Sequence, residues 1–464
     1  MKVKITGLLL LCSVVMGMAQ QKKWTLQECV AYAVENNLTI EQLELDLATV
    51  KIDKSDAVGA FLPNLNLSSG VSERSGLVVD PNSNANVSGT IFSVTPGITT
   101  GVTLFDGLQN IHRLNRAKLN TIASQFRLDD LKDDIRLSVA NSYLQILSNK
   151  EALEVAKAQY AVTEQDLKRT KELVDSGVVP RGDLLEIQAT AATQEQQIVN
   201  NEGLILISKI SLAQILQITD YANFEIADEE FNIPLSDILN NSAKDIFSKA
   251  LEFRNDIKVS ESNVAIAEKD QQIAKGALYP TINAFFNYNT FYTNQFAPVP
   301  DPNNPGQFLF DPNNQGTLLL TRESITNQFY LNDGISYGFQ INVPVFNGFS
   351  VKNNIKRAAI NLESSKLQLE QDKLALEAEI QQAYVNVSTF LKSYEAAEKT
   401  LEATTLAFEY SKERFDVGLM NAFEYSQAQS RIDNAKADVI RTKYDYIFRL
   451  KILEFYFGIP ISLE

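Results

Sequence analysis

Two long stretches of the chain carry a helical pattern of apolar residues and no helix breaker. Residues 108–176 and 349–417 each run for 69 residues without glycine or proline. Since globular helices average about 11–12 residues, each stretch predicts one helix of unusual length, about 100 Å at 1.5 Å per residue. Apolar residues recur in the first stretch mostly at steps of three and four, the spacing of one helix face. This apolar seam consists of Leu128, Leu131, Ile135, Val139, Tyr143, Ile146, Leu153, Ala156 and Tyr160.

The two stretches belong to an internal repeat. They align without a gap at an offset of 241 residues, which places Tyr143 on Tyr384. Upstream the offset falls to 217, where Pro63 meets Pro280. The difference of 24 residues predicts an insertion in the second copy, between Pro280 and Phe346. Self-similarity of this kind indicates two related modules.

Each module is predicted to contain a helix, two strands, the long helix and, after a tight turn, a further helix. The first helix starts at Thr25, where Glu28 completes a capping box, and runs to about Val58. The two shorter helices of a module together match the long one in length, so they can pair with it end to end. We expect a first repeat (20–217) with strands at about 64–72 and 93–104 and helices at 108–176 and 183–217, an acidic linker (218–241), and a second repeat (242–464) with strands at about 281–292 and 335–346 and helices at 349–417 and 423–457.

The segments between the helices alternate between apolar and polar residues with a period of two, which is typical of strands. In the fourth such segment Tyr337, Phe339 and Ile341 share a face opposite Gly338 and Gln340. A half-buried soluble sheet would show the same alternation, but the four predicted strands contain no lysine or arginine and are rich in asparagine. Each run is close to the 9–11 residues of a tilted transmembrane strand, so we favour strands in a membrane. A plain coiled coil would leave these segments unexplained.

The loops inside the two strand pairs, residues 72–92 and 293–333, are rich in turn and coil formers. Outer-membrane barrels place their long loops outside the cell, and the second loop contains the insertion. Four strands cannot close a barrel, and open edges are not viable in lipid. The chain is therefore expected to oligomerise: two copies would give a filled barrel of eight strands, and three a barrel of twelve with room for water.

The N-terminus is typical of a secretory signal peptide. Lys2 and Lys4 precede an apolar run that ends in small residues, which predicts a signal peptide over residues 1–19 and a mature chain from about Gln20. A lipoprotein anchor at Cys12 is disfavoured, because Leu11 stands where a small residue is expected. Past this leader no segment approaches the roughly 20 apolar residues of a spanning helix.

Charge and composition exclude several functions. Without the two leader lysines, 40 basic residues face 57 acidic ones, a formal net charge of −17, which argues against nucleic acid as a partner and is compatible with cation passage. One histidine, His112, and one cysteine in the mature chain, Cys29, rule out HExxH and CxxC sites. We read His112 as a polar residue at a helix start and Cys29 as a small core residue. No phosphate-binding loop is present, so we expect no enzyme, no cofactor and no metal site.

Several motifs occur in both repeats at matching places. Phe105-Asp106-Gly107 pairs with Phe346-Asn347-Gly348, and Asp175-Ser176-Gly177-Val178 pairs with Asp416-Val417-Gly418-Leu419. Gln188 and Gln429 follow the second pair. With these motifs the chain resembles the TolC family of outer-membrane efflux and secretion ducts, over essentially all of its mature length.

This resemblance implies a mainly α protein with membrane strands. A homotrimer would form a twelve-stranded barrel in outer-membrane lipid, continued by a long periplasmic α-helical barrel, in a Gram-negative bacterium. It would act as the passive exit duct of a tripartite efflux or type I secretion system, with a periplasmic adaptor (membrane fusion) protein and an inner-membrane pump as partners. The cargo, whether small drugs, metal ions or polypeptides, is not specified by the sequence.

The resemblance also implies site residues. The turns around Gly177, Val178, Gly418 and Leu419 would contact the adaptor. Glu424 and Asp183 would match the acidic positions of the periplasmic gate, while Gln427 replaces a further acid, so a ring of charge would be thinner here.

Independently of the resemblance, three symmetric Glu424 carboxylates near an axis would attract cations. Alternatively, Glu424 is a first-turn acid stabilised by the helix dipole. Pro180 and Arg181 are candidates for adaptor contact or for turn geometry. The competing function is a soluble periplasmic adaptor or a structural coiled-coil protein, which would be recovered in the soluble periplasmic fraction.

Overall fold

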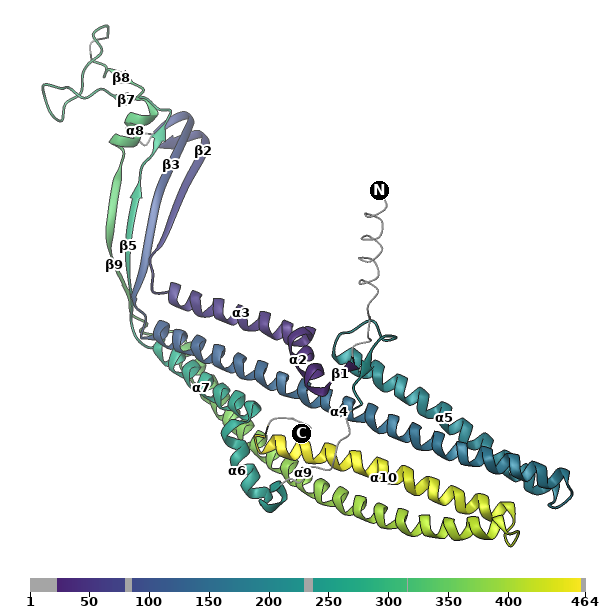
Figure 1. Ribbon diagram of the computed structural model, residues 1–464. Helices are drawn as coiled ribbons and strands as arrows, with labels where there is room; N and C mark the ends of the chain where they lie inside the picture. Colours follow the sequence, from purple (N-terminus) through teal and green to yellow (C-terminus); the bar gives the residue numbers. More distant parts are fainter. Residues whose placement is uncertain (1–22, 80–85, 229–236, 315, 460–464) are drawn as a thin grey trace, which may run out of the picture. The chain divides into compact units, whose positions relative to one another are not determined.

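The structure is a computed structural model that describes residues 23–79, 86–228, 237–314 and 316–459 (Figure 1). The predicted signal peptide lies outside these residues, as does the acidic part of the linker at 229–236. The chain divides into two compact units. The helical unit comprises the described parts of residues 1–48, 122–262 and 366–464, and the sheet unit comprises those of 49–121 and 263–365.

Corresponding helices of the two halves have equal lengths. Their first residues differ by 217 for the two short pairs and by 241 for the two long pairs, the same offsets that the sequence shows. The pairs are α2 (Leu26–Asn36) with α6 (Ala243–Phe253), 11 residues each; α3 (Leu38–Gly59) with α7 (Asn255–Gly276), 22; α4 (Gln109–Asp175) with α9 (Ser350–Asp416), 67; and α5 (Arg181–Ile215) with α10 (Ala422–Tyr456), 35.

The predicted single helix from Thr25 to Val58 is wrong, because the chain breaks it at Asn37. Asn37 adopts an extended conformation (φ −74°, ψ 122°). Its side chain donates to the carbonyl of Ile215 (3.1 Å) and accepts from the N–H of Thr39 (2.9 Å), so it ends α2 and caps the start of α3. Asparagine competes for backbone groups in this way, which makes it a poor residue inside a helix.

The predicted capping box at the start of α2 is confirmed. The Glu28 N–H donates to the Thr25 hydroxyl (3.2 Å), and the Thr25 N–H donates to the Glu28 carboxylate (3.1 Å). Cys29 is fully buried on the same helix, as expected of a core residue.

The helical unit contains three apolar cores, a small one around Ile40, Leu47 and Leu128 and two larger ones to which α10 contributes. The first larger core joins α10 to α2, α4 and α5, and Tyr143 at its centre donates to the carbonyls of Trp24 (3.3 Å) and Ala227 (3.1 Å). The second joins α10 to α6, α7 and α9, where Tyr384 donates to the carbonyl of Leu239 (3.4 Å). Each repeat thus uses its matching tyrosine to hold the backbone of the segment that links the repeats.

That linking segment contains two short elements. β4 (Glu225–Ile226) pairs in parallel with β1 (Lys23–Trp24), and a 3₁₀ turn, η1 (Asp237–Asn240), follows. Next to β4, Asp228 accepts from Lys150 (2.6 Å) and Lys23 (2.7 Å), and these hydrogen bonds hold the pKa of its carboxyl below the usual value. The acidic linker is thereby tied to basic residues of the helical unit.

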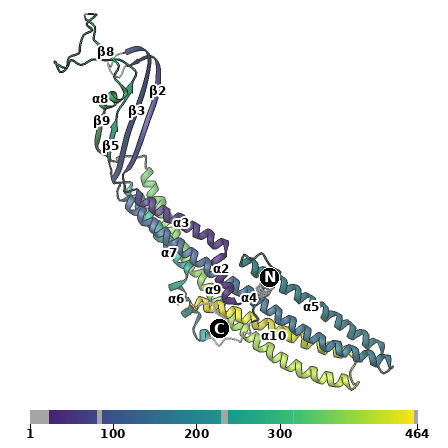
Figure 2. The ribbon, with the colours of Figure 1, turned by 45° about the horizontal axis from the view of Figure 1, so that its top comes forward.

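The main sheet of the sheet unit is built on four long antiparallel strands in the order β2-β3-β5-β9, so the two repeats meet where β3 pairs with β5 (Figure 2). β2 and β9 are the edges. The bounds are β2 (Asn64–Val79), β3 (Asn86–Phe105), β5 (Thr281–Asn289) and β9 (Gly334–Asn342).

The long loop predicted at residues 72–92 is wrong, because the hairpin of β2 and β3 continues through most of it. Pairing extends without a shift to Val79 opposite Asn86. Within the extension the hydroxyls of Ser75 and Thr90 share a hydrogen bond of 2.9 Å. Serine, glycine and charged residues interrupt the alternation here, so the strand pattern was not visible in the sequence.

The second loop, at residues 293–333, is also more ordered than its composition suggested. β6 (Tyr292–Thr293) adds to β3, and α8 (Ile325–Leu331) is held to β6 by Gln328. The buried Gln328 amide accepts from the N–H of Thr293 (2.9 Å) and donates to its carbonyl (3.0 Å), so it replaces a neighbouring strand.

Between β6 and α8 the chain forms a small three-sided motif. β7 (Ala297–Pro298) pairs with β8 (Leu320–Thr321). Three residues ten positions apart form a ring of backbone hydrogen bonds, in which Val299 donates to Leu319 (2.9 Å), Leu319 to Leu309 (2.7 Å) and Leu309 to Val299 (2.9 Å). An Asp-Pro-Asn-Asn turn separates each of these residues from the next.

The passage from strand to long helix uses the same backbone in both repeats. Gly107 and Leu108 have φ values of 70° and 66°, and Gly348 and Phe349 have values of 60° and 64°.

None of the helices in the described part of the chain carries an apolar stretch long enough to span a bilayer.

Candidate functional site

Two tight turns join the long helices to their partners, α4 to α5 and α9 to α10, and both lie at one end of the helical unit (Figures 1 and 2). In the first, Gly177 donates to Val174 (2.9 Å) and Val178 to Leu173 (2.8 Å). The second repeats this pattern at Gly418 and Leu419. It is the Schellman motif, which requires a left-handed residue after the helix. Gly177 (φ 76°) and Gly418 (φ 79°) meet that requirement.

The helices that follow the turns start differently. Pro180 precedes α5 without a side-chain cap. Asn421 caps α10, because its side chain accepts from the N–H of Glu424 (2.9 Å). The Glu424 carboxylate is exposed in the first turn of α10 and Asp183 is half-buried in that of α5, where both have a favourable interaction with the helix dipole.

A cavity of about 780 Å³ lies between the two turns. It brings together most of the residues predicted for the gate and the tips. Its wall includes Val178, Asp183, Gly418, Leu419 and Glu424. It also includes Asp416 of the second turn motif and two charged residues that the sequence did not point to, Arg169 and Arg414.

Gln427 lies elsewhere. It is exposed on α10, accepts from Arg431 (3.3 Å), and lines a second cavity between α4, α5 and α10. Gly177 forms the first turn itself.

Two side-chain links join the first helical hairpin (α4 and α5) to the second (α9 and α10) near the turns. Arg169 of α4 forms an ion pair with the carboxylate of Asp416 and also donates to its carbonyl (2.9 Å). The Tyr425 hydroxyl of α10 donates to the buried Asp166 carboxylate of α4 (2.7 Å). Tyr425 also stacks on Phe415, with ring centres 4.4 Å apart.

The Tyr425 ring is buried, and this burial, together with the hydrogen bond to Asp166, raises the pKa of its hydroxyl well above the usual value. The phenol therefore stays protonated at physiological pH and remains a donor to Asp166.

Further polar pairs continue this contact along the helices. Gln429 donates to the Thr163 hydroxyl (2.6 Å), and the hydroxyls of Thr190 and Ser426 lie 3.0 Å apart. On α4 the partners Thr163 and Asp166, and Thr170 after them, are buried and spaced by three and four residues. They prolong the apolar seam predicted from the sequence, but with polar side chains.

Sequence reasoning missed this polar contact, although one observation pointed to it. Polar residues at seam positions normally require a partner when buried, and the seam turns polar after Tyr160. The partners themselves lie on α10, more than 250 residues away. The arrangement fastens two helical hairpins together by hydrogen bonds and an ion pair, which can open and close without covalent chemistry.

Within the described residues, no three or more histidine, cysteine, aspartate or glutamate side chains are grouped to hold a metal ion. The geometry at the turns is that of a contact between two hairpins.

Solved structures show the same fold. The Campylobacter jejuni CmeC outer membrane channel is 16% identical, with 93% of this chain and 85% of that one covered at a TM-score of 0.77. The Vibrio cholerae outer membrane protein VceC is 14% identical, with 94% and 97% covered at 0.76. The open state of the Neisseria gonorrhoeae MtrE outer membrane channel is 15% identical, with 94% and 89% covered at 0.66.

No curated protein matches the chain in sequence. The family described as outer membrane efflux protein matches residues 31–216 and 246–458, which takes in both repeats and most of the chain. The resemblance to efflux ducts that the paired motifs indicated is thereby confirmed, and the chain belongs to the outer membrane efflux protein family.

Proposed function

We propose that the protein is the passive exit duct of a tripartite efflux or type I secretion system, in the outer membrane and extending into the periplasm. The observation that carries the proposal is the family match across both repeats. It favours a duct over the alternative of a soluble adaptor or structural coiled-coil protein. The family is one of efflux proteins, so energy for transport would come from a pump in the inner membrane.

A duct of this kind would require three copies of the chain. The edge strands β2 and β9 are open to pairing, and they carry exposed apolar side chains, among them Leu67 and Phe339. Open edges are costly in lipid, which favours pairing of β9 from one copy with β2 from the next. Three copies would supply twelve strands, enough for a barrel with a water-filled lumen. The paired hairpins of the three chains would then form the periplasmic α-helical barrel.

The two helix turns are the surface proposed for the adaptor. Val178 is 67% exposed and Leu419 is 72% exposed, each directly after the turn glycine Gly177 or Gly418. Two similar apolar tips on each chain would give an adaptor two sets of three equivalent contacts around a trimer. Exposed apolar residues in such a group are typical of contact with another protein.

We place the gate at the cavity between the turns. Asp183 and Glu424 line it, with Gln427 one turn further along α10. In a trimer the Glu424 carboxylates would repel one another and attract cations. The links from Arg169 to Asp416 and from Tyr425 to Asp166 would hold the gate closed.

Conductance of the purified protein in planar bilayers tests the function. A duct is extracted only with detergent, forms a trimer and conducts ions after reconstitution. Recovery in the soluble periplasmic fraction, or a monomer in mild detergent without conductance, would contradict the proposal.

Replacement of Glu424 tests the gate. Glu424→Ala removes three carboxylates from the trimer, so we expect a weaker block by divalent cations and a changed single-channel conductance. Glu402→Ala, at an exposed position on α9 away from the turns, is the matched control and should leave both unchanged. If the two variants behave alike, Glu424 is not part of the gate.

A further inference from the structure

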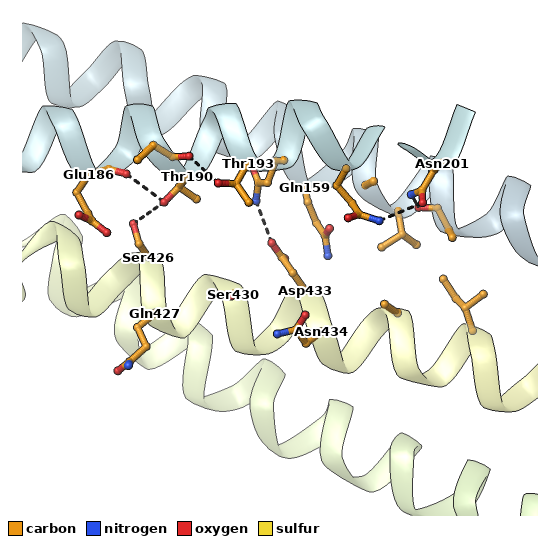
Figure 3. Close-up of a pocket in the computed structure, with 18 of the residues that line it drawn as sticks. Gln159, Glu186, Thr190, Thr193, Asn201, Ser426, Gln427, Ser430, Asp433 and Asn434 are labelled. Atoms are coloured by element: carbon orange, nitrogen blue, oxygen red, sulfur yellow. Dashed lines mark hydrogen bonds between the residues drawn. The ribbon is translucent and has the colours of Figure 1, made fainter. Parts of the chain in front are cut away.

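The second cavity, between α4, α5 and α10, has features of a ligand site. Its volume is about 580 Å³, within the range of roughly 300–1,000 Å³ that is typical of small-molecule pockets. Figure 3 shows polar side chains from the three helices converging on it, including Gln159, Asp433 and Asn434. It lies farther from the turns than the gate cavity and shares none of that cavity's lining residues.

Two polar atoms at this cavity have no hydrogen-bond partner. Gln194 is 9% exposed and its amide nitrogen donates to Asp433 (2.9 Å), but its amide oxygen is buried without a donor. The amide nitrogen of Gln159 is buried without an acceptor. Since buried polar groups are almost always paired, these two atoms indicate a missing partner that both donates and accepts hydrogen bonds.

Asp433 also lacks a counter-ion. Burial raises the pKa of its carboxyl, against the opposing effects of the Gln194 hydrogen bond and the charge of Lys436. In the described part of the chain no ion pair includes Asp433: Lys436 acts on it only at longer range. Asp433 is half-buried, and a carboxylate removed from water without a cation is costly, so a positively charged ligand would be favoured here.

The wall also has an apolar part among its polar side chains. Val155 and Ala156 of α4 line it, as do Phe423 and Ile440 of α10. A hydrated metal ion would gain nothing from these side chains, whereas the apolar body of an organic molecule would be removed from water.

We propose that this cavity binds a small organic cation with an apolar body, whose ammonium group donates to the Asp433 carboxylate and the Gln194 amide oxygen. A hydroxyl on the ligand would accept from Gln159. Because Gln194 lies on α5 and Asp433 on α10, the bound ligand would bridge the two hairpins. This binding site goes beyond the exit duct, which needs only an open lumen.

Tyramine is a suitable probe, because it carries an ammonium group, an aromatic ring and a hydroxyl. N-acetyltyramine has nearly the same body without the charge. We expect saturable tyramine binding to the purified full-length protein in detergent, measured by saturation-transfer NMR, at least tenfold tighter than binding of N-acetyltyramine.

Three variants locate the site. Asp433→Asn should weaken tyramine binding at least tenfold, and Thr193→Phe should do so by filling the space while leaving Asp433 in place. Asp438→Asn is the control, since Asp438 lies on the same helix but is exposed and pairs with Arg441 (2.8 Å). It should bind tyramine as the wild type does. Circular dichroism melting would confirm that each variant is folded.

Three results would overturn the proposal: no saturable binding, which means that the cavity holds only water; equal affinity for the charged and neutral probes; or equal affinity in Asp433→Asn and Asp438→Asn. None of these measurements depends on conductance, so they are independent of the test for a duct.

Discussion

Gly107 carries two constraints at once. Its φ of 70° favours glycine, and a Cβ atom placed there would lie 2.1 Å from the carbonyl oxygen of Gly276. The matching Gly348 has a φ of 60° but nothing within 4 Å of such a Cβ. Substitution of Gly348 therefore tests the backbone conformation alone, whereas substitution of Gly107 tests the same conformation together with close packing.

We expect Gly348→Ala to lower the free energy of unfolding by about 1–2 kcal/mol, the cost of a left-handed alanine. Gly107→Ala should cost several kcal/mol more, because the added methyl group collides with backbone that cannot turn away. Thermal melting of the two purified variants measures the difference. Equal melting temperatures would show that the contact with Gly276 is relaxed easily.

Asp130 of α4 lies in an unusually acidic environment. It is half-buried, and Asp133, Asp134 and Asp256 all act on it, opposed by Arg254. Burial, the largest effect, and these carboxylates raise its pKa to about 6. A raised carboxyl pKa favours the folded state while the group is protonated, and this stabilisation is lost as the pH rises from about 4 through about 6.

Asp130→Asn should therefore raise the melting temperature at pH 7.5 by about 2 °C, a modest value because the site is partly solvated. At pH 4 the variant and the wild type should melt together. Asp129→Asn removes the same formal charge one residue away, and we expect its melting temperature to follow the wild type at both pH values. A pH-independent effect of Asp130→Asn would contradict this assignment.

At this scale the sequence predicted local features better than distant ones. The turn glycines Gly177 and Gly418 were predicted from their own neighbourhood, because a helix end needs a left-handed residue nearby. The link between Asp166 and Tyr425 was not predicted. A buried carboxylate needs a partner, and the partner of Asp166 lies 259 residues further along the chain.

Between elements, the two helical hairpins are held together near their turns by polar contacts. Farther away they are held by the apolar core that joins α4 and α5 to α10. A polar contact needs less rearrangement of packing to open than an apolar core does. We therefore expect the ends at the turns to separate first.

Tyr425→Phe isolates one link. It keeps the stacking on Phe415 but leaves the Asp166 carboxylate buried without its donor, which costs about 1–3 kcal/mol. We expect a lower melting temperature and a larger or more frequent open conductance in bilayers. Tyr394→Phe is the control, because that tyrosine donates only to Glu398 on its own helix. Identical conductance in both variants would show that the link does not restrain the gate.

Helices were easier to predict than strands. Long apolar periodicity predicts a helix from many residues at once, whereas one asparagine at position 37 was enough to break the first helix. The extended hairpin of β2 and β3 was missed because the charged residues Glu73 and Arg74 interrupt the alternating pattern, so the strand was predicted to end before them. Its backbone pairs across to β3 regardless of these side chains.

For the whole molecule, the open edges of the sheet are the feature from which assembly follows. If β9 pairs with β2 of another copy, cysteines on the two strands can come within disulfide reach only between chains. Cys29, the one cysteine among the described residues, is buried in the helical unit and should not interfere.

We therefore predict that Leu67→Cys, combined in turn with cysteine at Tyr337, Phe339 or Ile341, gives one double variant that forms covalent dimers and trimers on oxidation. The single variants are the controls, and none should form covalent trimers. Non-reducing gel electrophoresis of membranes checks this. Absence of trimers in all three combinations would argue against pairing of these edges.

At this scale the sequence predicted the family and the exposed turns but not the polar seam inside the helical unit. Paired motifs such as Phe105-Asp106-Gly107 and its counterpart repeat at fixed spacing, so they identify the family without any contact being known. The number of copies stays a prediction, because one chain supplies only the edges at which copies would meet.

The chain segment that forms the ring of Val299, Leu309 and Leu319 enters and leaves at neighbouring backbone positions, since Ala297 pairs with Thr321. Excision of residues 299–319 would leave Pro298 paired with Leu320, so a tight turn could rejoin the two chain ends. An epitope or a fluorescent reporter grafted in place of these residues would label the protein without touching the strands that carry it.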